Sequence, residues 1–304
     1  YNGTSNDLSY GVEVCLGARA TNAPVLGATV VSVRGRGLLA GELQCRFGES
    51  DGAMAWSGGA SRLRCASAPS AVTGWVGVQL SSFYGALSSG GSFYYHAPLV
   101  ASALTPALGP ERGGTRVTVL GSFFRDAYTL RCRFENASAA VLARYVDDNQ
   151  LECSSPVHSL GPKRLMLSMN GQQYDEGTLT FTYQAAAAVS SVSPASALAE
   201  GGTPVTVHGA HFSAASEALG LLLCRIGSTV RRAVWASSTA VVCNTTRSVA
   251  GEVRVEVSNN GREYTSDGVR LQLVSVRVVE VQPWSGPVLG ATVVSVRGRG
   301  LLAG

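Results

Sequence analysis

Lysine is nearly missing from this chain of 304 residues, and charge of either sign is scarce. Lys163 is the single lysine among 24 basic residues, and charged residues make up 14% of the sequence. The net charge of +4 is scattered, which excludes the basic footprint of a nucleic-acid-binding protein. The preference for arginine, together with abundant alanine and glycine, indicates a GC-rich genome rather than a binding device.

Long apolar runs and helical periodicity are lacking as well. No apolar segment approaches the roughly 20 residues that a membrane helix needs, and no signal peptide is visible. The chain begins at Tyr1 without a methionine, so we expect a mature product or a fragment. Apolar residues nevertheless make up 45% of the sequence, which is enough for several domains with cores of their own.

Groups that carry chemistry are few, and they form no catalytic or metal-binding set. His208 and His211 have the spacing of a metal pair, but related segments have leucine, arginine and phenylalanine there, which favours an ordinary strand end. The other histidines are His96 and His158. The acidic run Asp147–Asn149 is expected in a turn, and Arg34–Gly37 with its copy Arg297–Gly300 is either an anion site or, as we prefer, a solvated turn. The sequence therefore predicts no enzyme, cofactor or metal.

Short runs in which apolar and polar residues alternate fill most of the chain. Examples are TRVTVLG at 115–121, TPVTVHG at 203–209 and EVRVEVS at 252–258. Alternation with a period of two places one face of a strand on a core and the other in water. Because turn signals separate many such runs, the sequence predicts an all-β fold built of β-sandwiches.

These runs belong to a repeat of nearly ninety residues. Residues 104–124 align with residues 192–212, a weaker copy begins at Leu26, and a truncated copy closes the chain. Each full copy continues with Cys-Arg-Phe or Cys-Arg-Ile, and then has an aromatic residue before a second cysteine. We expect these aromatics, Trp56, Tyr145 and Trp235, to pack beside the cysteines in the core. Two copies carry a late Asn-Gly, at 170–171 and 260–261, which predicts a tight primed turn.

An exact repeat of eighteen residues adds a longer period. Pro287–Gly304 reproduces Pro24–Gly41 letter for letter, at an offset of 263 residues. This offset spans three copies of the shorter repeat, so we expect a parent protein built of three-domain units. Residues 1–23 do not match residues 264–286, and the identity therefore begins abruptly at Pro24. A recent duplication explains this, and an artificial join is the alternative.

The repeated motif Gly-Gly-Thr-x-Val-Thr-Val-x-Gly-x-x-Phe, followed by Cys-x-Phe and Leu-x-Cys-x-x-Pro, resembles the IPT/TIG family of immunoglobulin-like domains. The copy at 12–96 departs from it, because its opening lacks Gly-Gly-Thr and Leu38 replaces the aromatic residue. The resemblance implies tandem β-sandwiches in an elongated array. The expected parts are the end of a preceding domain at 1–11, full domains at 12–96, 97–185 and 186–273, and the start of a further domain at 274–304.

Six of the seven cysteines fall into pairs at one fixed place in each full copy. This regular pairing predicts the disulfides Cys45–Cys65, Cys132–Cys153 and Cys224–Cys243. Buried free thiols are the alternative, and zinc is disfavoured because no Cys-x-x-Cys occurs. Cys15 lies in the expected first strand of the first full domain. It is either a buried thiol or bonded to a cysteine outside this sequence, in the same or another chain.

Three Asn-x-Ser/Thr sequons are present, at Asn2, Asn136 and Asn244. Asn244 follows Cys243 on an expected strand, so its side chain points away from the core if Cys243 points into it. Asn136 is expected in a turn and Asn2 in a hairpin. Disulfides and N-glycans together predict a secretory route and an extracellular or cell-surface location.

The joins between expected domains run from strand to strand, without a Gly/Ser spacer, which predicts a stiff rod. Our leading hypothesis is an extracellular structural protein, a repeating segment of a surface filament or coat. It would self-associate through sheet edges or bind other filament proteins. The resemblance extends to mastigonemes, the flagellar hairs of algae. The alternative is the stalk of a receptor ectodomain similar to plexin or fibrocystin-like proteins. A DNA-binding factor of the Rel type and an enzyme accessory domain are weaker options.

Overall fold

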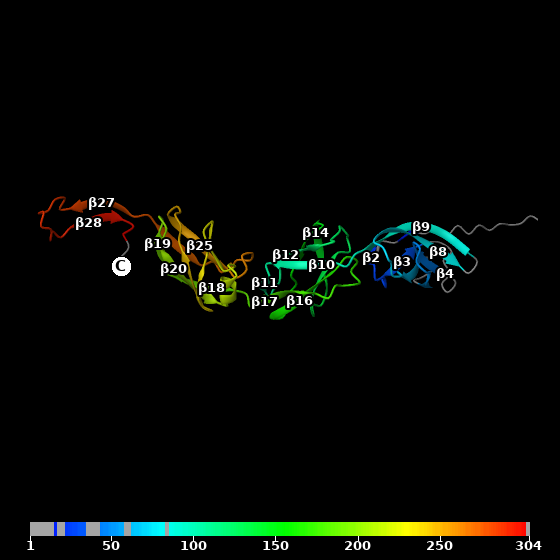
Figure 1. Ribbon diagram of the computed structural model, residues 1–304. Coiled ribbons are helices and arrows are strands. Elements are labelled where there is room, and N and C mark those ends of the chain that lie inside the picture. Colours follow the sequence, from blue (N-terminus) through cyan, green and yellow to red (C-terminus); the bar gives the residue numbers. More distant parts are fainter. Residues whose placement is uncertain (1–14, 17–21, 35–42, 58–61, 83–84, 302–304) are drawn as a thin grey trace, which may run out of the picture. The chain divides into compact units, whose positions relative to one another are not determined.

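The computed structural model describes residues 15–16, 22–34, 43–57, 62–82 and 85–301, which carry colour in Figure 1. Strands joined by turns and loops, with one short helix, make up these residues, so the predicted all-β class is confirmed. They form two compact units. The first unit comprises residues 1–107 and 116–182, and the second comprises 108–115 and 183–304. The segment Leu108–Thr115 is therefore part of the second repeat of the sequence, but it is grouped with the second unit.

The first sandwich, in the first unit, consists of two sheets. The four-stranded sheet has the order β1 (Cys15–Leu16), β3 (Val30–Arg34), β7 (Arg62–Ala66) and β6 (Trp56–Ser57). The five-stranded sheet has the order β2 (Asn22–Pro24), β9 (Gly85–His96), β8 (Gly74–Ser82), β4 (Leu43–Phe47) and β5 (Ala53–Met54). Alternate residues of both sheets are buried, as the period-two pattern requires. The fully buried side chains include Val31, Val33, Leu63, Leu80 and Phe93.

The second sandwich repeats this plan, with its strands hydrogen-bonded in one continuous order. The order is β10 (Val100–Thr105), β12 (Arg116–Ser122), β15 (Gln150–Ser154), β14 (Val141–Asp147), β13 (Arg131–Phe134), β16 (Gly161–Ser168), β17 (Leu179–Gln184) and β11 (Leu108–Pro110). β14 carries the order from one face of the core to the other, because it pairs with both β15 and β13.

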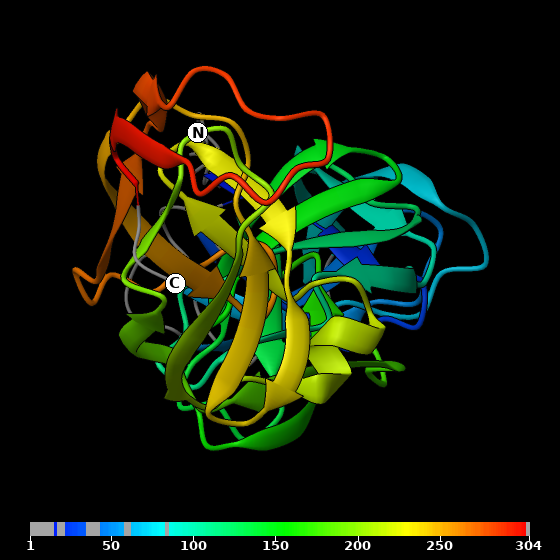
Figure 2. The ribbon, with the colours of Figure 1, turned by 90° about the vertical axis from the view of Figure 1, so that its left-hand side faces the viewer.

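The third sandwich lies in the second unit, and its strands are coloured yellow-green to orange in Figure 2. One sheet has the order β18 (Ala188–Ser193), β20 (Pro204–Ala210), β24 (Ala240–Asn244) and β23 (Val234–Ser237). The other has the order β19 (Ser196–Leu198), β26 (Arg270–Val274), β25 (Gly251–Ser258), β21 (Leu223–Ile226) and β22 (Thr229–Arg232). The short helix α1 (Ala214–Ala218) begins after Ser213, whose hydroxyl accepts a hydrogen bond from the Ser216 N–H.

The glycine and the phenylalanine of the repeated motif have distinct structural reasons. A Cβ atom on Gly121 would lie 2.1 Å from the Val100 carbonyl oxygen, and one on Gly209 would lie 1.9 Å from that of Ala188. Only glycine fits here, because the first strand of each sandwich bulges against the second at this point. The phenylalanine three residues later, Phe124 or Phe212, is buried in the core.

The first sandwich keeps the backbone of the motif although it lacks Gly-Gly-Thr. Gly27 and Ala28 have φ angles of 75° and 60°, and the corresponding Gly113 and Gly114 have 72° and 88°. Ala28 therefore adopts a left-handed conformation that favours glycine. The threonine that follows, Thr29, occupies the place of Thr115, so the departure in sequence leaves the turn intact.

The two copies of the eighteen-residue repeat lie in different surroundings. In the first copy, Val31 and Val33 on β3 are completely buried. In the second copy, the same valines are Val294 and Val296, which are 45% and 49% exposed. There β28 (Ser295–Arg299) pairs with β27 (Arg277–Gln282) in a two-stranded sheet. The same valines thus lie in a sandwich core in the first copy and on a two-stranded sheet in the second.

Candidate functional site

The two Asn-Gly loops hold the most extensive polar networks that link one repeat to the next. In the first, the Asn170 side-chain oxygen accepts hydrogen bonds from the backbone N–H groups of Gln172 (2.9 Å) and Gln173 (3.1 Å). Gly171 has a φ of 72°, whereas Asn170 is not in the left-handed region. The predicted primed turn is therefore wrong, because the first central residue of either primed turn, here Asn170, needs a positive φ. The asparagine instead folds the loop around its own side chain.

The Asn170 amide group then reaches the first sandwich. Its Nδ2 lies 3.3 Å from the Asn22 carbonyl oxygen, 3.0 Å from Thr29 Oγ1 and 2.6 Å from Gln173 Oε1. The Thr29 hydroxyl in turn donates to Gln173 Oε1 at 2.7 Å. We call these four residues, Asn22, Thr29, Asn170 and Gln173, the first joint. Thr29 is completely buried in it and Asn170 is 5% exposed, so the network is sheltered from water.

Neighbouring side chains extend the first joint. The Gln172 side-chain amide donates to the Val30 carbonyl and accepts from the Val30 N–H, both at 2.9 Å. The Gln172 side chain thereby exchanges a pair of hydrogen bonds with the backbone of β3, as a residue of a neighbouring antiparallel strand does. The Arg125 guanidinium donates to the Tyr94 hydroxyl and lies 4.3 Å from the centre of its ring. The first and second sandwiches of this unit are thus linked by direct polar contacts as well as by the chain.

A second joint with the same composition lies within the second unit. Asn260 Nδ2 is 3.2 Å from the Leu108 carbonyl oxygen, 3.4 Å from Thr115 Oγ1 and 2.5 Å from Glu263 Oε2. The Thr115 hydroxyl donates to Glu263 Oε2 at 2.8 Å. We call Leu108, Thr115, Asn260 and Glu263 the second joint. A carboxylate replaces the Gln173 amide here, and the geometry is otherwise reproduced.

An arginine supports each Asn-Gly loop from within its own sandwich. The Arg133 guanidinium lies 3.9 Å from the centre of the Tyr174 ring, and that of Arg225 lies 4.2 Å from the centre of the Tyr264 ring. These arginines are the middle residues of the Cys-Arg-Phe and Cys-Arg-Ile triplets, and each tyrosine comes four residues after the loop asparagine. In these two sandwiches the contact gives the arginine beside the cysteine a structural role, since a cation–π contact fixes both side chains.

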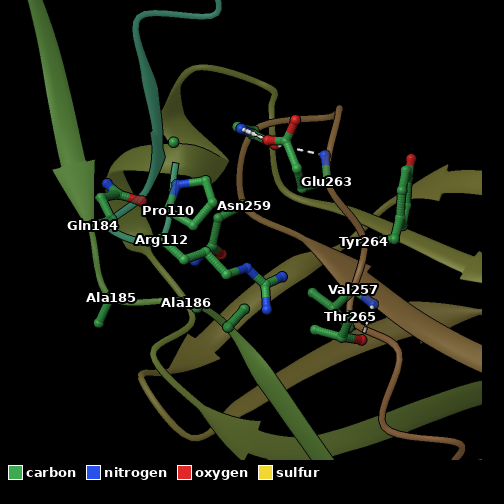
Figure 3. A pocket seen from close by; sticks show the side chains of 13 residues that line it. Pro110, Arg112, Gln184, Ala185, Ala186, Val257, Asn259, Glu263, Tyr264 and Thr265 are labelled. Atoms are coloured by element: carbon green, nitrogen blue, oxygen red, sulfur yellow. Dashed lines mark hydrogen bonds between the residues drawn. The ribbon is translucent and has the colours of Figure 1, made fainter. Parts of the chain in front are cut away.

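A small cleft borders the second joint. It leaves room of about 20 Å³, space for roughly one water molecule. In Figure 3, Pro110 and Gln184 lie on one side of the cleft, and Glu263 and Tyr264 lie on the other. The cleft is too small for an organic ligand, so we regard it as part of the joint.

In the first unit, His96 occupies the position that corresponds to Gln184. Burial lowers the pKa of this histidine, whose Nδ1 lies 2.8 Å from the Ala97 carbonyl oxygen.

The six cysteines that the repeat pairs are bonded in the structure. The disulfides are Cys45–Cys65, Cys132–Cys153 and Cys224–Cys243, with Cα atoms 6.2 to 6.3 Å apart. Each joins a strand of one sheet to a strand of the facing sheet. Cys15 lies on β1, at the register position opposite Arg34.

The recurring aromatics lie on β6, β14 and β23 and differ in burial. Trp56 is 41% exposed, so it is not the core residue that we expected. Trp235 packs against its core and donates from Nε1 to the Phe212 carbonyl at 3.1 Å. Tyr145 is half-buried and bonds to the Asp148 carboxylate, which raises the pKa of Tyr145 to about 12. Asp147 ends β14, and the rest of the acidic run, Asp148 and Asn149, forms the turn between β14 and β15.

The sequon asparagines Asn136 and Asn244 both lie at the surface. Asn136 occupies a tight turn with a φ of 61°. Asn244 ends β24 between the buried Cys243 and Thr245, so its side chain faces away from the core. Asn2 lies outside the described residues.

The histidine pair and the second copy of the basic stretch occupy ordinary surface positions. His208 is on β20, and His211 Nδ1 lies 3.0 Å from the Ala186 carbonyl oxygen. Arg297 on β28 faces Glu280 at 3.7 Å, and the first copy of this basic stretch lies outside the described residues after Arg34. Within the described part of the chain, no group of three or more His, Cys, Asp or Glu residues could hold a metal ion. In the same residues, no helix is long and apolar enough to cross a membrane.

Sequence reasoning missed the joints, although signals for them exist. Threonine recurs at 29, 115 and 203, and Gln or Glu stands three residues after each loop asparagine. These signals gain meaning only once the fold brings Thr29 and Asn170 together across 141 residues.

β-Sandwiches of the immunoglobulin type that follow one another along the chain, each with an internal disulfide, define a tandem-domain scaffold. The sequence profile of the IPT/TIG domain matches residues 99–183 and 187–273, more than half of the chain. The chain therefore belongs to the IPT/TIG family, as its motifs predicted.

Known proteins similar to this chain are much longer than it is. Human Plexin-A3 is 27% identical over 116 residues, which cover 38% of this chain and 6% of that protein. Human Fibrocystin-L is 24% identical over 205 residues, which cover 66% of this chain and 5% of that protein. Among solved structures, the full extracellular region of plexin A4 matches with a TM-score of 0.40 and 14% identity, over 90% of this chain and 30% of that one.

Proposed function

We propose that this chain is an extracellular spacer, a series of IPT/TIG domains whose joints limit the motion between successive domains. The observation that carries the proposal is the repeated joint, which buries the same Asn–Thr pair twice. A buried polar network resists bending, because opening it would expose or orphan several hydrogen-bonding groups. We propose domain limits of 12–96, 97–185 and 186–273 for this series.

The disulfides and the likeness to plexin and fibrocystin-L support an extracellular location. Surface sequons at Asn136 and Asn244 support N-glycosylation there. The spacer accordingly supplies no catalytic group, cofactor or metal. Its role is to hold other parts of a larger protein at a set separation, as the stalk of a receptor or adhesion protein does.

A second candidate, a repeating segment of a surface filament such as a mastigoneme, is favoured by the exact eighteen-residue repeat. Near-identical units suit periodic assembly through self-association. Electron microscopy of the native material distinguishes the two. Beads along a fibre with a three-domain periodicity would establish the filament, and separate membrane-anchored particles would establish the stalk. Globular particles with the domains packed side by side would refute both.

A further inference from the structure

The third sandwich carries the accepting half of a joint. Each joint has two accepting groups. One is a backbone carbonyl on a short strand, that of Asn22 on β2 in the first joint and of Leu108 on β11 in the second. The other is the hydroxyl of a threonine seven residues later. The third sandwich has the same short strand, β19, and it pairs in parallel with β26 as β2 pairs with β9. Ser196 and Thr203 occupy the places of the accepting residues.

Residues 196–203 are less buried than the corresponding residues of the two joints, so within the described part of the chain no loop covers them. In the first joint, Asn22, Gly27 and Thr29 are all buried, and so are Leu108, Gly113 and Thr115 in the second. The corresponding residues of the third sandwich, Ser196, Gly201 and Thr203, are only half-buried. Thr203 Oγ1 accepts from the Leu198 N–H at 3.3 Å, and among the described residues no side chain accepts a hydrogen bond from its hydroxyl.

We propose that the edge formed by residues 196–203 is a docking site for the Asn-Gly loop of a further IPT/TIG domain joined in tandem. The occupant is defined by its chemistry, Asn-Gly-x-Gln/Glu. Its asparagine amide donates to the Ser196 carbonyl and Thr203 Oγ1, and its Gln or Glu oxygen accepts from the Thr203 hydroxyl. This inference rests on the two joints, and it holds whether the spacer serves a stalk or a filament.

The strands that follow the third sandwich support a tandem occupant. In each joint, the loop belongs to the sandwich that comes next in the sequence. That sandwich opens with two long strands, β10 and β12 in the first joint and β18 and β20 in the second. β27 and β28 pair in the same way, with the same bulge, between Val278 and Glu280. A domain that opens with this pair is therefore attached in the manner of the two domains whose loops fill the joints.

The test appends a complete domain to the third sandwich within the full chain. Residues 100–185, which carry the Asn170 loop, replace the chain after Val276, and amide hydrogen exchange is followed at residues 196–203. We expect exchange there to slow about tenfold relative to the same chain with Asn→Ala in the appended loop. Residues 22–29 and 108–115, which lie in the filled joints, provide the protected reference within the same molecule.

Two further variants keep the result specific. Thr203→Val, which retains the side-chain shape, should abolish the added protection while leaving residues 108–115 unchanged. An appended first domain, residues 12–96, has Phe83–Tyr84 in place of Asn-Gly and should give no added protection. Equal exchange at 196–203 with and without the loop asparagine would overturn the docking site but would leave the spacer proposal standing, since that depends on the first two joints.

Discussion

Replacing Thr29 by valine removes one hydroxyl from the first joint and leaves the shape of the side chain unchanged. That hydroxyl donates to Gln173 Oε1 at 2.7 Å and accepts from Asn170 Nδ2 at 3.0 Å, and the side chain is completely buried. The backbone bond from the Thr29 N–H to Ser67 Oγ is retained. The change therefore tests the polar link between the first two sandwiches without altering the loop itself.

The magnitude follows from the two hydrogen bonds that are lost. Each contributes about 1 kcal/mol net, and a buried group left unpaired costs more. Asn170 Nδ2 and Gln173 Oε1 still bond to each other at 2.6 Å, so neither is left without a partner. We therefore expect a loss of about 1–2 kcal/mol. In a unit of this size, each kcal/mol lowers the unfolding temperature by about 2–4 °C.

The assay is thermal unfolding of the full chain, followed by calorimetry. Thr118→Val is the matched control, because Thr118 is a half-buried threonine on β12 of the same unit. Thr29→Val should unfold several degrees below this control. Equal unfolding temperatures for the two variants would show that the Thr29 hydroxyl contributes nothing to the joint.

Three other outcomes follow from the structure. Burial lowers the pKa of His96 below 6.5, so just below that pH the unfolded state binds more protons than the folded state. The free energy of unfolding therefore falls as the pH drops through this window. Measured by chemical denaturation, this fall should be shallower in His96→Gln. Ala28→Gly should raise the free energy of unfolding by about 0.5–1 kcal/mol, because glycine tolerates the φ of 60°; a loss of stability would contradict this. Glycosidase treatment should leave deamidated residues at Asn136 and Asn244, and unmodified peptides at both sites would exclude the glycans.

The fold was accessible from sequence because its signals are local or repeated. The alternation around Val117 and Val119 reports which face is buried, and three similar cysteine spacings of 20, 21 and 19 residues report contacts between sheets. Comparison between copies also showed where the first domain departs from the motif. It did not show that Ala28 would take the left-handed backbone of a glycine, since that depends on the turn around it.

The joints could not be read in this way, because each depends on residues far apart in the chain. Asn-Gly alone predicts a primed turn, and only the contact with Thr29 shows that the Asn170 side chain serves the neighbouring sandwich. The exposure of Trp56 was misjudged for a related reason. A recurring aromatic position indicates a shared place on a strand, but the burial of that place depends on what covers it.

The central claim is that the first joint holds the first two sandwiches in a fixed relation. Pulsed electron paramagnetic resonance between spin labels on non-natural amino acids, one on β8 and one on β16, measures this relation directly. The account predicts a single narrow distance distribution for the parent chain, which broadens in Asn170→Ala and stays narrow in Asn149→Ala, whose asparagine lies outside the joint. A broad distribution in the parent chain, or no change in Asn170→Ala, would contradict it.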